Sequence, residues 1–362
     1  MRMATLVVNR SALRANLAAV RAIIGDRTLV AVVKANAYGH GVDPVARWLL
    51  EDGADRLAVA YLDEALELRE LLPDGCARVM VLGGTPPEYA EACVGSGAIL
   101  TVGRVDEIAP LADAAQRTGR AVRVHLKVDT GMSRLGVPLA RVPEALSAIA
   151  GRTELRLEGA FSHLATADEA DETYAREQLA RWTDACGLLP AGVETHVLAS
   201  AGILRFPDHL GSGVRPGLLV YGVDPLAGVA APPLSQAMRL EARLEVVREA
   251  PEGAGVSYGA SWRTPSPTRL GVVPVGYADG YPRSLSNMGW VVFRGQRAPI
   301  RGRVCMDRFM VDLTPWPDAA PGEPVTLLGD GASVNQVAEA AGTINHEILC
   351  RLGPRLARRY EG

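Results

Sequence analysis

The sequence predicts an α/β fold, a (β/α)₈ barrel of the TIM type followed by a mostly β C-terminal domain. Eight short apolar runs alternate with helical stretches as far as Gly222. A break then follows at Asp224–Pro233, which is rich in proline and alanine. Strand-like segments with glycine and proline turns come after this break. Alternating strands and helices are typical of a parallel sheet, whereas successive strands with little helix are typical of a separate β domain.

The eight apolar runs are the predicted strands of the barrel. Nearly continuous apolar strands are buried on both faces, as in parallel sheets covered by helices, and eight of them favour closure into a barrel. An open doubly wound sheet is the alternative, but no GxGxxG motif follows the first run. The predicted strands are Leu29–Lys34, Leu57–Ala60, Arg78–Leu82, Ala98–Val102, Val122–Asp129, Arg156–His163, Val193–Ala199 and Val214–Gly222.

The stretches between these runs have the apolar spacing of helices. Asp43–Gly53 starts with Asp and Pro and stops at glycine, and Asp63–Leu72 ends before Pro73. Glu169–Leu189 is long and polar on one side. We expect the barrel to occupy residues 1–233 and the β domain residues 234–362. Within the β domain, only the stretch from about Asn335 has a helical pattern.

Composition excludes several classes of protein. The net charge is −3 with no basic block, which disfavours a nucleic-acid-binding or polybasic membrane-binding protein. No apolar run approaches the length of a membrane span, and the N-terminus has no signal-peptide pattern, so we expect a cytoplasmic protein. The five cysteines form no CxxC pair, which argues against a disulfide framework or a metal site.

The use of lysine is more informative. Lysine and arginine together number 38, and Lys34 and Lys127 are the only lysines. Arginine fills the other basic positions, but its guanidinium does not deprotonate and cannot act as an amine nucleophile. Two lysines retained in such a chain are therefore candidates for amine chemistry, although chance retention is the alternative.

Both lysines are expected at the mouth of the barrel. Lys34 ends the first predicted strand, and side chains at the carboxyl ends of barrel strands face the active site. A partly desolvated amine there would have a lowered pKa and could attack an aldehyde. Lys127 and Asp129 share one face near the end of the fifth strand, close to Arg134. The alternative for each lysine is an ordinary ion pair, at the rim of the barrel for Lys34 and in its interior for Lys127.

Later strand ends supply further polar residues. His163 ends the sixth run and His196 lies in the seventh, where a histidine satisfied within the core is the alternative. Loops after the seventh and eighth strands of barrels often bind phosphate. Here Ser200 is expected at the N-terminus of the helix after the seventh strand, and Arg215, Gly217 and Leu218 lie on the predicted eighth strand.

In the β domain, Tyr258 stands between small residues in GVSYGASW, and RVCMDRF places Cys305, Met306 and Asp307 in a predicted strand. Each of these two signals is weak alone, because tyrosine, methionine and cysteine usually serve packing.

Seven segments together resemble the alanine racemase family, in its order and spacing and over essentially the whole chain. The segments are VVKANAYGHG, HLKVDTGMSRLG, FSHLATADE, VRPGLLVYG, GVSYGASW, VGYADGY and RVCMDRFMVDL. The resemblance implies a barrel that binds pyridoxal 5′-phosphate (PLP), followed by a β domain. It implies interconversion of L- and D-alanine by two-base proton transfer, which supplies D-alanine for cell-wall peptidoglycan. It also implies a homodimer with shared active sites.

The resemblance also implies roles for individual residues. Lys34 resembles the lysine that binds PLP covalently and is the base for the D-face of the substrate. Tyr258 resembles the L-face base, supplied by the partner subunit. Arg215 is similar to the arginine facing the pyridine nitrogen, and His163 to the histidine linking it to Tyr258. The cofactor-binding set is completed by Tyr38, His196, Ser200, Gly217 and Leu218.

The remaining roles concern the substrate. Arg134 and the backbone N–H of Met306 are expected to meet the substrate carboxylate. Lys127 matches a lysine that is carbamylated in some members and orients Arg134. Tyr277 resembles a residue of the access channel, and Asp307 is expected to support the site. No metal is expected.

Two positions depart from the family pattern. Ala199 stands where many members have Asn, and Pro354 falls near a position where some have a Tyr touching the phosphate. Three alternative functions stay open: a broader amino-acid racemase, for instance for serine, a PLP decarboxylase of the same architecture, and a non-catalytic PLP carrier made of a barrel alone. Tyr258 and the β domain that contains it argue against the last two.

Overall fold

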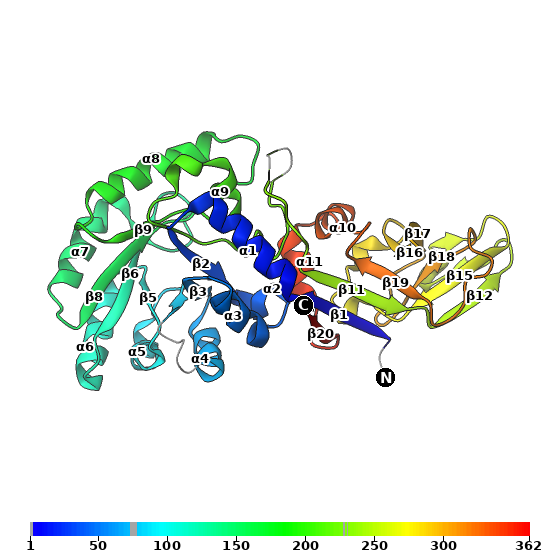
Figure 1. The fold of residues 1–362 in the computed structure, drawn as a ribbon, viewed down its shortest axis with the longest axis horizontal. Helices are drawn as coiled ribbons and strands as arrows, with labels where there is room; N and C mark the ends of the chain where they lie inside the picture. Colours follow the sequence, from blue (N-terminus) through cyan, green and yellow to red (C-terminus); the bar gives the residue numbers. More distant parts are fainter. Residues whose placement is uncertain (1–2, 73–77, 227–228, 230) are drawn as a thin grey trace.

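The computed structural model describes residues 3–72, 78–226, 229 and 231–362. It confirms the predicted α/β class. Figure 1 shows the barrel on the left and the strand-rich domain on the right, with the C-terminal helices α10 (Val334–Ala341) and α11 (Asn345–Arg351) at their junction. Pro73, Cys76 (one of the five cysteines) and residues 227–228 and 230 of the predicted break lie outside the described residues.

Eight parallel strands close the barrel. Two sheets, ordered β10-β2-β3-β4 and β5-β6-β8-β9, are joined by parallel bridges between Met80 and Ile99 and between Ala199 and Arg215. The strands are β2 (Thr28–Val32), β3 (Arg56–Val59), β4 (Val79–Val81), β5 (Leu100–Val102), β6 (Val122–Asp129), β8 (Leu155–Phe161), β9 (Glu194–His196) and β10 (Gly213–Val214). The short β7 (Val137–Pro138) pairs with β6.

Helices follow the strands and cover the barrel from outside (Figure 1). Their buried faces follow the predicted apolar spacing; in α3, for example, Val42, Val45, Ala46 and Leu49 are buried. The helices of this half are α1 (Arg10–Ile24), α2 (Lys34–Tyr38), α3 (Val42–Glu51), α4 (Leu62–Leu71), α5 (Ala90–Ser96), α6 (Ile108–Thr118), α7 (Val142–Ala150), α8 (Thr173–Gly187) and α9 (Ser200–Arg205), with 3₁₀ turns η2 (Pro87–Tyr89), η3 (Val105–Glu107), η4 (Leu139–Arg141) and η5 (Pro207–His209).

Several strands are shorter than predicted, and this changes where site residues lie. The predicted eighth strand, Val214–Gly222, is only β10, because the chain then turns, with Val220 N donating to Gly217 O at 2.9 Å. Lys34 lies two residues beyond β2 instead of ending it, and His163 lies two residues beyond β8. These side chains come from segments just beyond the carboxyl ends of the strands, and Lys34 begins the short left-handed turn labelled α2.

The second domain contains a nine-stranded sheet, ordered β12-β15-β18-β17-β16-β19-β11-β1-β20. A separate two-stranded sheet pairs β13 with β14. The elements are β11 (Met238–Arg243), β12 (Val246–Ala250), β13 (Gly255–Val256), β14 (Trp262–Arg263), β15 (Thr268–Val273), β16 (Trp290–Phe293), β17 (Gln296–Arg301), β18 (Phe309–Asp312), β19 (Pro324–Leu328) and β20 (Ala357–Glu361), with turns η6 (Tyr258–Ala260), η7 (Tyr277–Asp279) and η8 (Arg283–Leu285).

Both ends of the chain belong to this large sheet. The first strand, β1 (Ala4–Asn9), pairs antiparallel with β11 and parallel with β20. The helical pattern from about Asn335 predicts no strand at the end of the chain, so β20 is a correction to that prediction. The domain boundary between residues 233 and 234 stays a prediction. β1 lies before this boundary in the sequence, but it pairs with strands of the second domain.

A further prediction was wrong: Cys305, Met306 and Asp307 are not in a strand. They form a turn before β18, in which Cys305 N bonds Arg308 O at 2.9 Å. The VCMDRFMVDL segment therefore contains a loop and a four-residue strand. In the described part of the chain, no helix has the length and apolar character needed to cross a membrane.

Candidate active site

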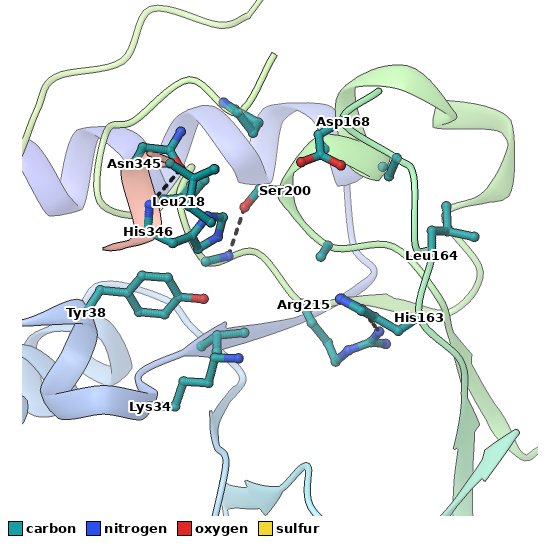
Figure 2. A pocket seen from close by; sticks show the side chains of 18 of the residues that line it. Lys34, Tyr38, His163, Leu164, Asp168, Ser200, Arg215, Leu218, Asn345 and His346 are labelled. Atoms are coloured by element: carbon teal, nitrogen blue, oxygen red, sulfur yellow. Dashed lines mark hydrogen bonds between the residues drawn. The ribbon is translucent and has the colours of Figure 1, made fainter. Parts of the chain in front are cut away.

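A cavity of about 1110 Å³ opens at the carboxyl ends of the barrel strands. Of the predicted barrel residues, it brings together Lys34, Tyr38, Lys127, Arg134, His163, Ser200, Arg215, Gly217 and Leu218. Figure 2 shows Lys34 and Tyr38 on one side of the cavity and His163 and Arg215 on another. Helices α10 and α11 form part of its wall, through residues that include Asn335 and His346.

The turn that starts at Lys34 has an uncommon backbone. Residues 35–38 all have φ between 52° and 54°, which is the left-handed helical region. Such residues lose roughly 1–2 kcal/mol each there, so neighbouring groups must hold them. Val42 N donates to the Asn36 side chain at 2.7 Å, and Ala35 N donates to Glu64 Oε1 at 2.7 Å. The turn carries Lys34 and Tyr38 to the same cavity, and the Tyr38 side chain is buried.

The pKa of the Lys34 amine lies below its ordinary value. Burial is the main cause, and the positive charge of Arg134 lowers this pKa further. Glu64 acts in the opposite direction. A lowered pKa increases the neutral fraction of the amine, which is the form that attacks a carbonyl or accepts a proton.

Another part of the cavity presents hydroxyl groups. Ser200 Oγ accepts bonds from Gly217 N at 2.9 Å and Leu219 N at 3.2 Å, which leaves its own O–H free to donate. A Cβ at Gly217 would lie 2.5 Å from the Tyr38 hydroxyl, so glycine is required for this close approach. As predicted, Ser200 begins a helix, α9.

Arg215 is almost fully buried and is held by neutral acceptors. Its NH1 nitrogen donates to His196 O at 2.8 Å and to His196 Nδ1 at 2.5 Å. Its NH2 nitrogen donates to Ser162 O at 2.6 Å and lies 3.4 Å from His163 Nδ1. Burial lowers the pKa of Arg215 to about 9, so the group remains a cation at neutral pH.

His196, which accepts a hydrogen bond from Arg215, also contacts a second buried histidine, His125. Because arginine can only donate, His196 Nδ1 must accept, and neutral His196 then carries its proton on Nε2. His196 Nε2 lies 2.9 Å from His125 Nδ1, which is therefore an acceptor. A Cβ at Gly159 would lie 2.4 Å from the His125 ring, so this glycine makes room for the pair. Sequence reasoning included His196 but missed His125, which precedes Lys127 by two residues.

The buried histidines predict an acid-sensitive fold. Burial lowers the pKa of His40 to about 4 and of His125 to about 3, and it holds the pKa values of His163 and His196 well below the usual range. The unfolded chain binds protons at these sites below about pH 6.5, so each lowers the free energy of unfolding by about 1.4 kcal/mol per pH unit of further acidification.

We therefore expect the free energy of unfolding to fall steeply between pH 7 and pH 5.5, as measured by urea unfolding of the apoprotein at fixed concentration. Ordinary carboxylates titrate below this window. A constant midpoint across it would show that these histidines are not neutral in the folded protein.

Lys127 lies deep in the cavity wall. Its Nζ is 4.6 Å from the centre of the Phe161 ring. Burial is the main cause that lowers the pKa of Lys127, to about 7, and the charges of Arg215 and Arg134 add to it. Lys127 is therefore neutral in a large fraction of molecules at neutral pH.

The predicted residues of the β domain do not line this cavity. They gather on one face of the second domain: Tyr277 N bonds Cys305 O at 3.0 Å, and Ser257 Oγ lies 3.2 Å from Cys305 Sγ. Tyr258 is 72% exposed and Met306 52% exposed. A Cβ at Gly276 would lie 2.2 Å from Met306 O, so the two turns pack too closely for any side chain at this position. Arg355 bonds the Asp307 carboxylate and lies 3.3 Å from that of Asp279.

Two of the expected departures have a structural outcome. Ala199 lines the cavity beside Ser200, whereas Pro354 is absent from the lining. Instead, His346 of α11 reaches the cavity, with its ring centre 5.8 Å from that of Tyr38. Sequence reasoning missed His346, and its only signal was its place in a chain with six histidines.

Comparison with known proteins places this geometry in a family. The sequence patterns of the alanine racemase N-terminal and C-terminal domains match residues 8–225 and 237–360. The chain belongs to the alanine racemase family. An alanine racemase of Desulfovibrio desulfuricans is 39% identical to it over 363 residues, covering 98% of this chain and 96% of the relative.

Solved alanine racemases have the same architecture. The enzyme from Streptomyces lavendulae, which produces D-cycloserine, superposes with a TM-score of 0.94 at 37% identity, covering 100% of this chain and 98% of the other. The enzyme from Bartonella henselae, solved with covalently bound PLP, gives a TM-score of 0.92 at 32% identity, covering 99% of this chain and 100% of the other. These matches confirm the predicted family and the two-part fold.

Proposed function

We propose that this member of the alanine racemase family interconverts L- and D-alanine with PLP as its cofactor. The observation that carries the proposal is the cavity at the barrel mouth, which combines Lys34, Arg215 and His163 in a chain that matches the family along both domains. That match disfavours both the decarboxylase and the carrier made of a barrel alone.

The cavity residues fit PLP. A partly buried amine, Lys34, suits covalent attachment to an aldehyde. The free O–H of Ser200 and the Tyr38 hydroxyl suit a phosphate, and Gly217 leaves the room that the Tyr38 hydroxyl needs beside the backbone. When bound, PLP withdraws electrons from the α-carbon of the substrate.

Racemisation removes the α-proton from one face and returns a proton to the other, so two bases are needed. We assign the D-face to Lys34, whose lowered pKa favours the neutral amine. We assign the L-face to Tyr258 of the partner subunit, because Tyr258 is exposed on the second domain and absent from the cavity of its own chain. Arg134 and the backbone of the partner subunit's Met306 would hold the substrate carboxylate.

When PLP is bound, Arg215 would set the electronic environment of its ring. With a pKa of about 9, it stays a cation, and its bonds to His196 and Ser162 fix its position. A cationic donor beside the pyridine nitrogen disfavours protonation of that nitrogen, which should limit side reactions such as transamination. His163 adjoins Arg215 and would connect it to Tyr258 of the partner subunit.

The wider setting is part of the same proposal. Two copies related by a two-fold axis would each complete the other's cavity, because such an axis repeats one contact twice. We also propose a cytoplasmic location and a role in supplying D-alanine for peptidoglycan. Tyr277 and Asp307, on the face that carries Tyr258, would line or support the access channel.

We further propose that Lys127 is carbamylated. A neutral amine adds CO₂ to give a carbamate and releases one proton, and burial already lowers the pKa of Lys127 to about 7. The product is an anion next to Arg134 and Arg215, the two cations that otherwise destabilise a charged lysine there.

Protein equilibrated with ¹³CO₂ should show a protected carbamate resonance in ¹³C NMR. Since Lys127 and Lys34 are the only lysines, assignment needs only two variants, Lys127→Arg and Lys34→Arg. The resonance should vanish in the first and persist in the second. Its persistence in Lys127→Arg would assign it elsewhere and refute the carbamate at this site.

The activity itself is tested by incubating the protein with single L-amino acids in D₂O. We expect α-deuterium incorporation together with inversion for alanine. Inversion of serine at a comparable rate would favour the broader racemase, and exchange with loss of CO₂ would favour a decarboxylase. No exchange with alanine by the PLP-loaded protein would refute the proposed function.

A further inference from the structure

His346 is the one histidine on the C-terminal helices that faces the cavity. It lies on α11, and its ring packs at 42° to the Tyr38 ring with 5.8 Å between centres. Figure 2 shows His346 beside Leu218 and Tyr38, with Arg215 and His163 on another side. His346 therefore borders the same region as Ser200 and Gly217.

The charges on this side of the cavity are poorly matched to a phosphate. A phosphate ester carries between one and two negative charges near neutral pH. The groups proposed to hold it, Tyr38, Ser200 and Gly217, offer neutral hydroxyls and backbone. Arg215 lies across the cavity and is held by Ser162 and His196. Lys34 is close enough for its charge to act on His346, but its amine would be taken up by the aldehyde of PLP. Among the described residues on the phosphate side, His346 then remains the side chain that can gain a positive charge near neutral pH.

We propose that His346 is a ligand of the cofactor phosphate and binds it as the imidazolium, so that binding of PLP takes up a proton at this residue. This inference rests on the placement of the phosphate beside Tyr38, Ser200 and Gly217 in the proposed function. It concerns the binding of the cofactor and assigns His346 no part in proton transfer to the substrate.

The surroundings determine the sign of the pH dependence. Partial burial and the charge of Lys34 lower the pKa of His346 in the protein alone, and Asp168 opposes them. A phosphate anion would raise this pKa, because an opposite charge favours the charged form. The other titratable groups around it are Tyr38 on α2, Glu339 on α10, and Glu347, Cys350 and Arg351 on its own helix.

The bound form therefore holds more protons at His346 than the free form. As pH rises between the two pKa values of this residue, the affinity for PLP should fall by as much as about tenfold per unit. The phosphate and Lys34 also titrate, so the contribution of His346 is the difference between the wild-type protein and a variant in which this group cannot titrate.

The test measures the dissociation constant of PLP for the apoprotein from pH 6 to pH 9 by visible absorbance, with proton uptake from calorimetry in two buffers. His346→Gln keeps a neutral donor of similar size, and His209→Gln is the matched control outside the cavity. We expect His346→Gln to bind PLP about tenfold more weakly than wild type at pH 6.5 and with the same dissociation constant at pH 9. Binding of PLP to this variant should take up fewer protons than binding to wild type. His209→Gln should match wild type.

Pyridoxal, which lacks the phosphate, provides the second control. It should bind wild type and His346→Gln with the same pH profile. Identical PLP profiles and proton uptake for wild type and His346→Gln would overturn the proposal, as would an equal effect of His346→Gln on pyridoxal.

Ser200→Ala separates this failure from a failure of the phosphate placement itself. It should weaken PLP at every pH and leave pyridoxal unchanged. If it does so while His346→Gln has no effect, His346 alone is excluded. If it affects neither compound, the phosphate lies elsewhere and both inferences fail.

Discussion

Lys34→Arg should yield a colourless protein with no covalently attached cofactor and no racemase activity. Arginine keeps the positive charge and most of the length but does not provide a neutral amine. The substitution removes both the attachment point and the proposed D-face base, so we expect a loss beyond the ~10²–10⁴-fold typical of one general base.

The matched control is Lys127→Arg, which should stay yellow, because Lys127 packs against the Phe161 ring and is not the proposed attachment point. Borohydride reduction of the wild-type holoprotein, followed by peptide mass spectrometry, identifies the modified lysine directly. Since the chain has only two lysines, label on Lys127 instead of Lys34 would reverse the assignment.

The barrel was predictable because its signals are local. Each of the eight parallel strands overlaps a predicted run, although β10 does so only at Val214, and a helix begins at Ser200 as expected. Strand ends were less predictable: the apolar run at Val214–Gly222 continues past β10, although the backbone there turns, with Tyr221 and Val223 both bonded to Leu218 O. Apolar side chains fill the core in either conformation, so hydrophobicity does not mark where a strand stops.

Long-range pairings were not predictable. The strand at Ala4–Asn9 has β-rich residues, but its partners, β11 and β20, lie more than two hundred residues away in the chain. Nor does any local signal in KANAY indicate four left-handed residues, because alanine and tyrosine disfavour that region. It is held by distant partners such as Glu64. His346 was missed for the same reason, since only the fold brings α11 to the barrel mouth.

The site residues near the ends of the barrel strands could be predicted to lie together, whereas the relation of the β-domain residues to them could not. Lys34, Lys127, His163 and Arg215 all reach one cavity, as the barrel topology requires. Tyr258, Tyr277 and Met306 form a coherent face of turns tied together by backbone bonds, yet this face stands apart from the cavity of the same chain. A single sequence carries no record of which surface a second copy covers.

Tyr258→Phe should therefore damage the two directions of exchange unequally. The substitution removes only a hydroxyl from a side chain that is 72% exposed in the single chain, so the fold should be retained. Loss of one general base commonly costs ~10²–10⁴-fold. We expect that loss in α-deuterium washout from L-alanine, measured in single turnovers, while washout from D-alanine by Lys34 survives better. Net racemisation must fall in both directions, because the overall equilibrium is fixed.

Complementation tests whether this tyrosine comes from the partner subunit. Lys34→Ala and Tyr258→Phe homodimers should each be inactive, but in a mixed dimer one site receives both defects and the other receives neither. Random exchange of equal amounts makes half of the dimers mixed, so about a quarter of the wild-type activity should return, following the two-fold symmetry of the assembly. Native mass spectrometry verifies the exchange. If exchange is complete and no activity returns, Tyr258 does not act across the interface. If washout falls equally from both enantiomers, it is not the L-face base, and its hydroxyl only positions other groups.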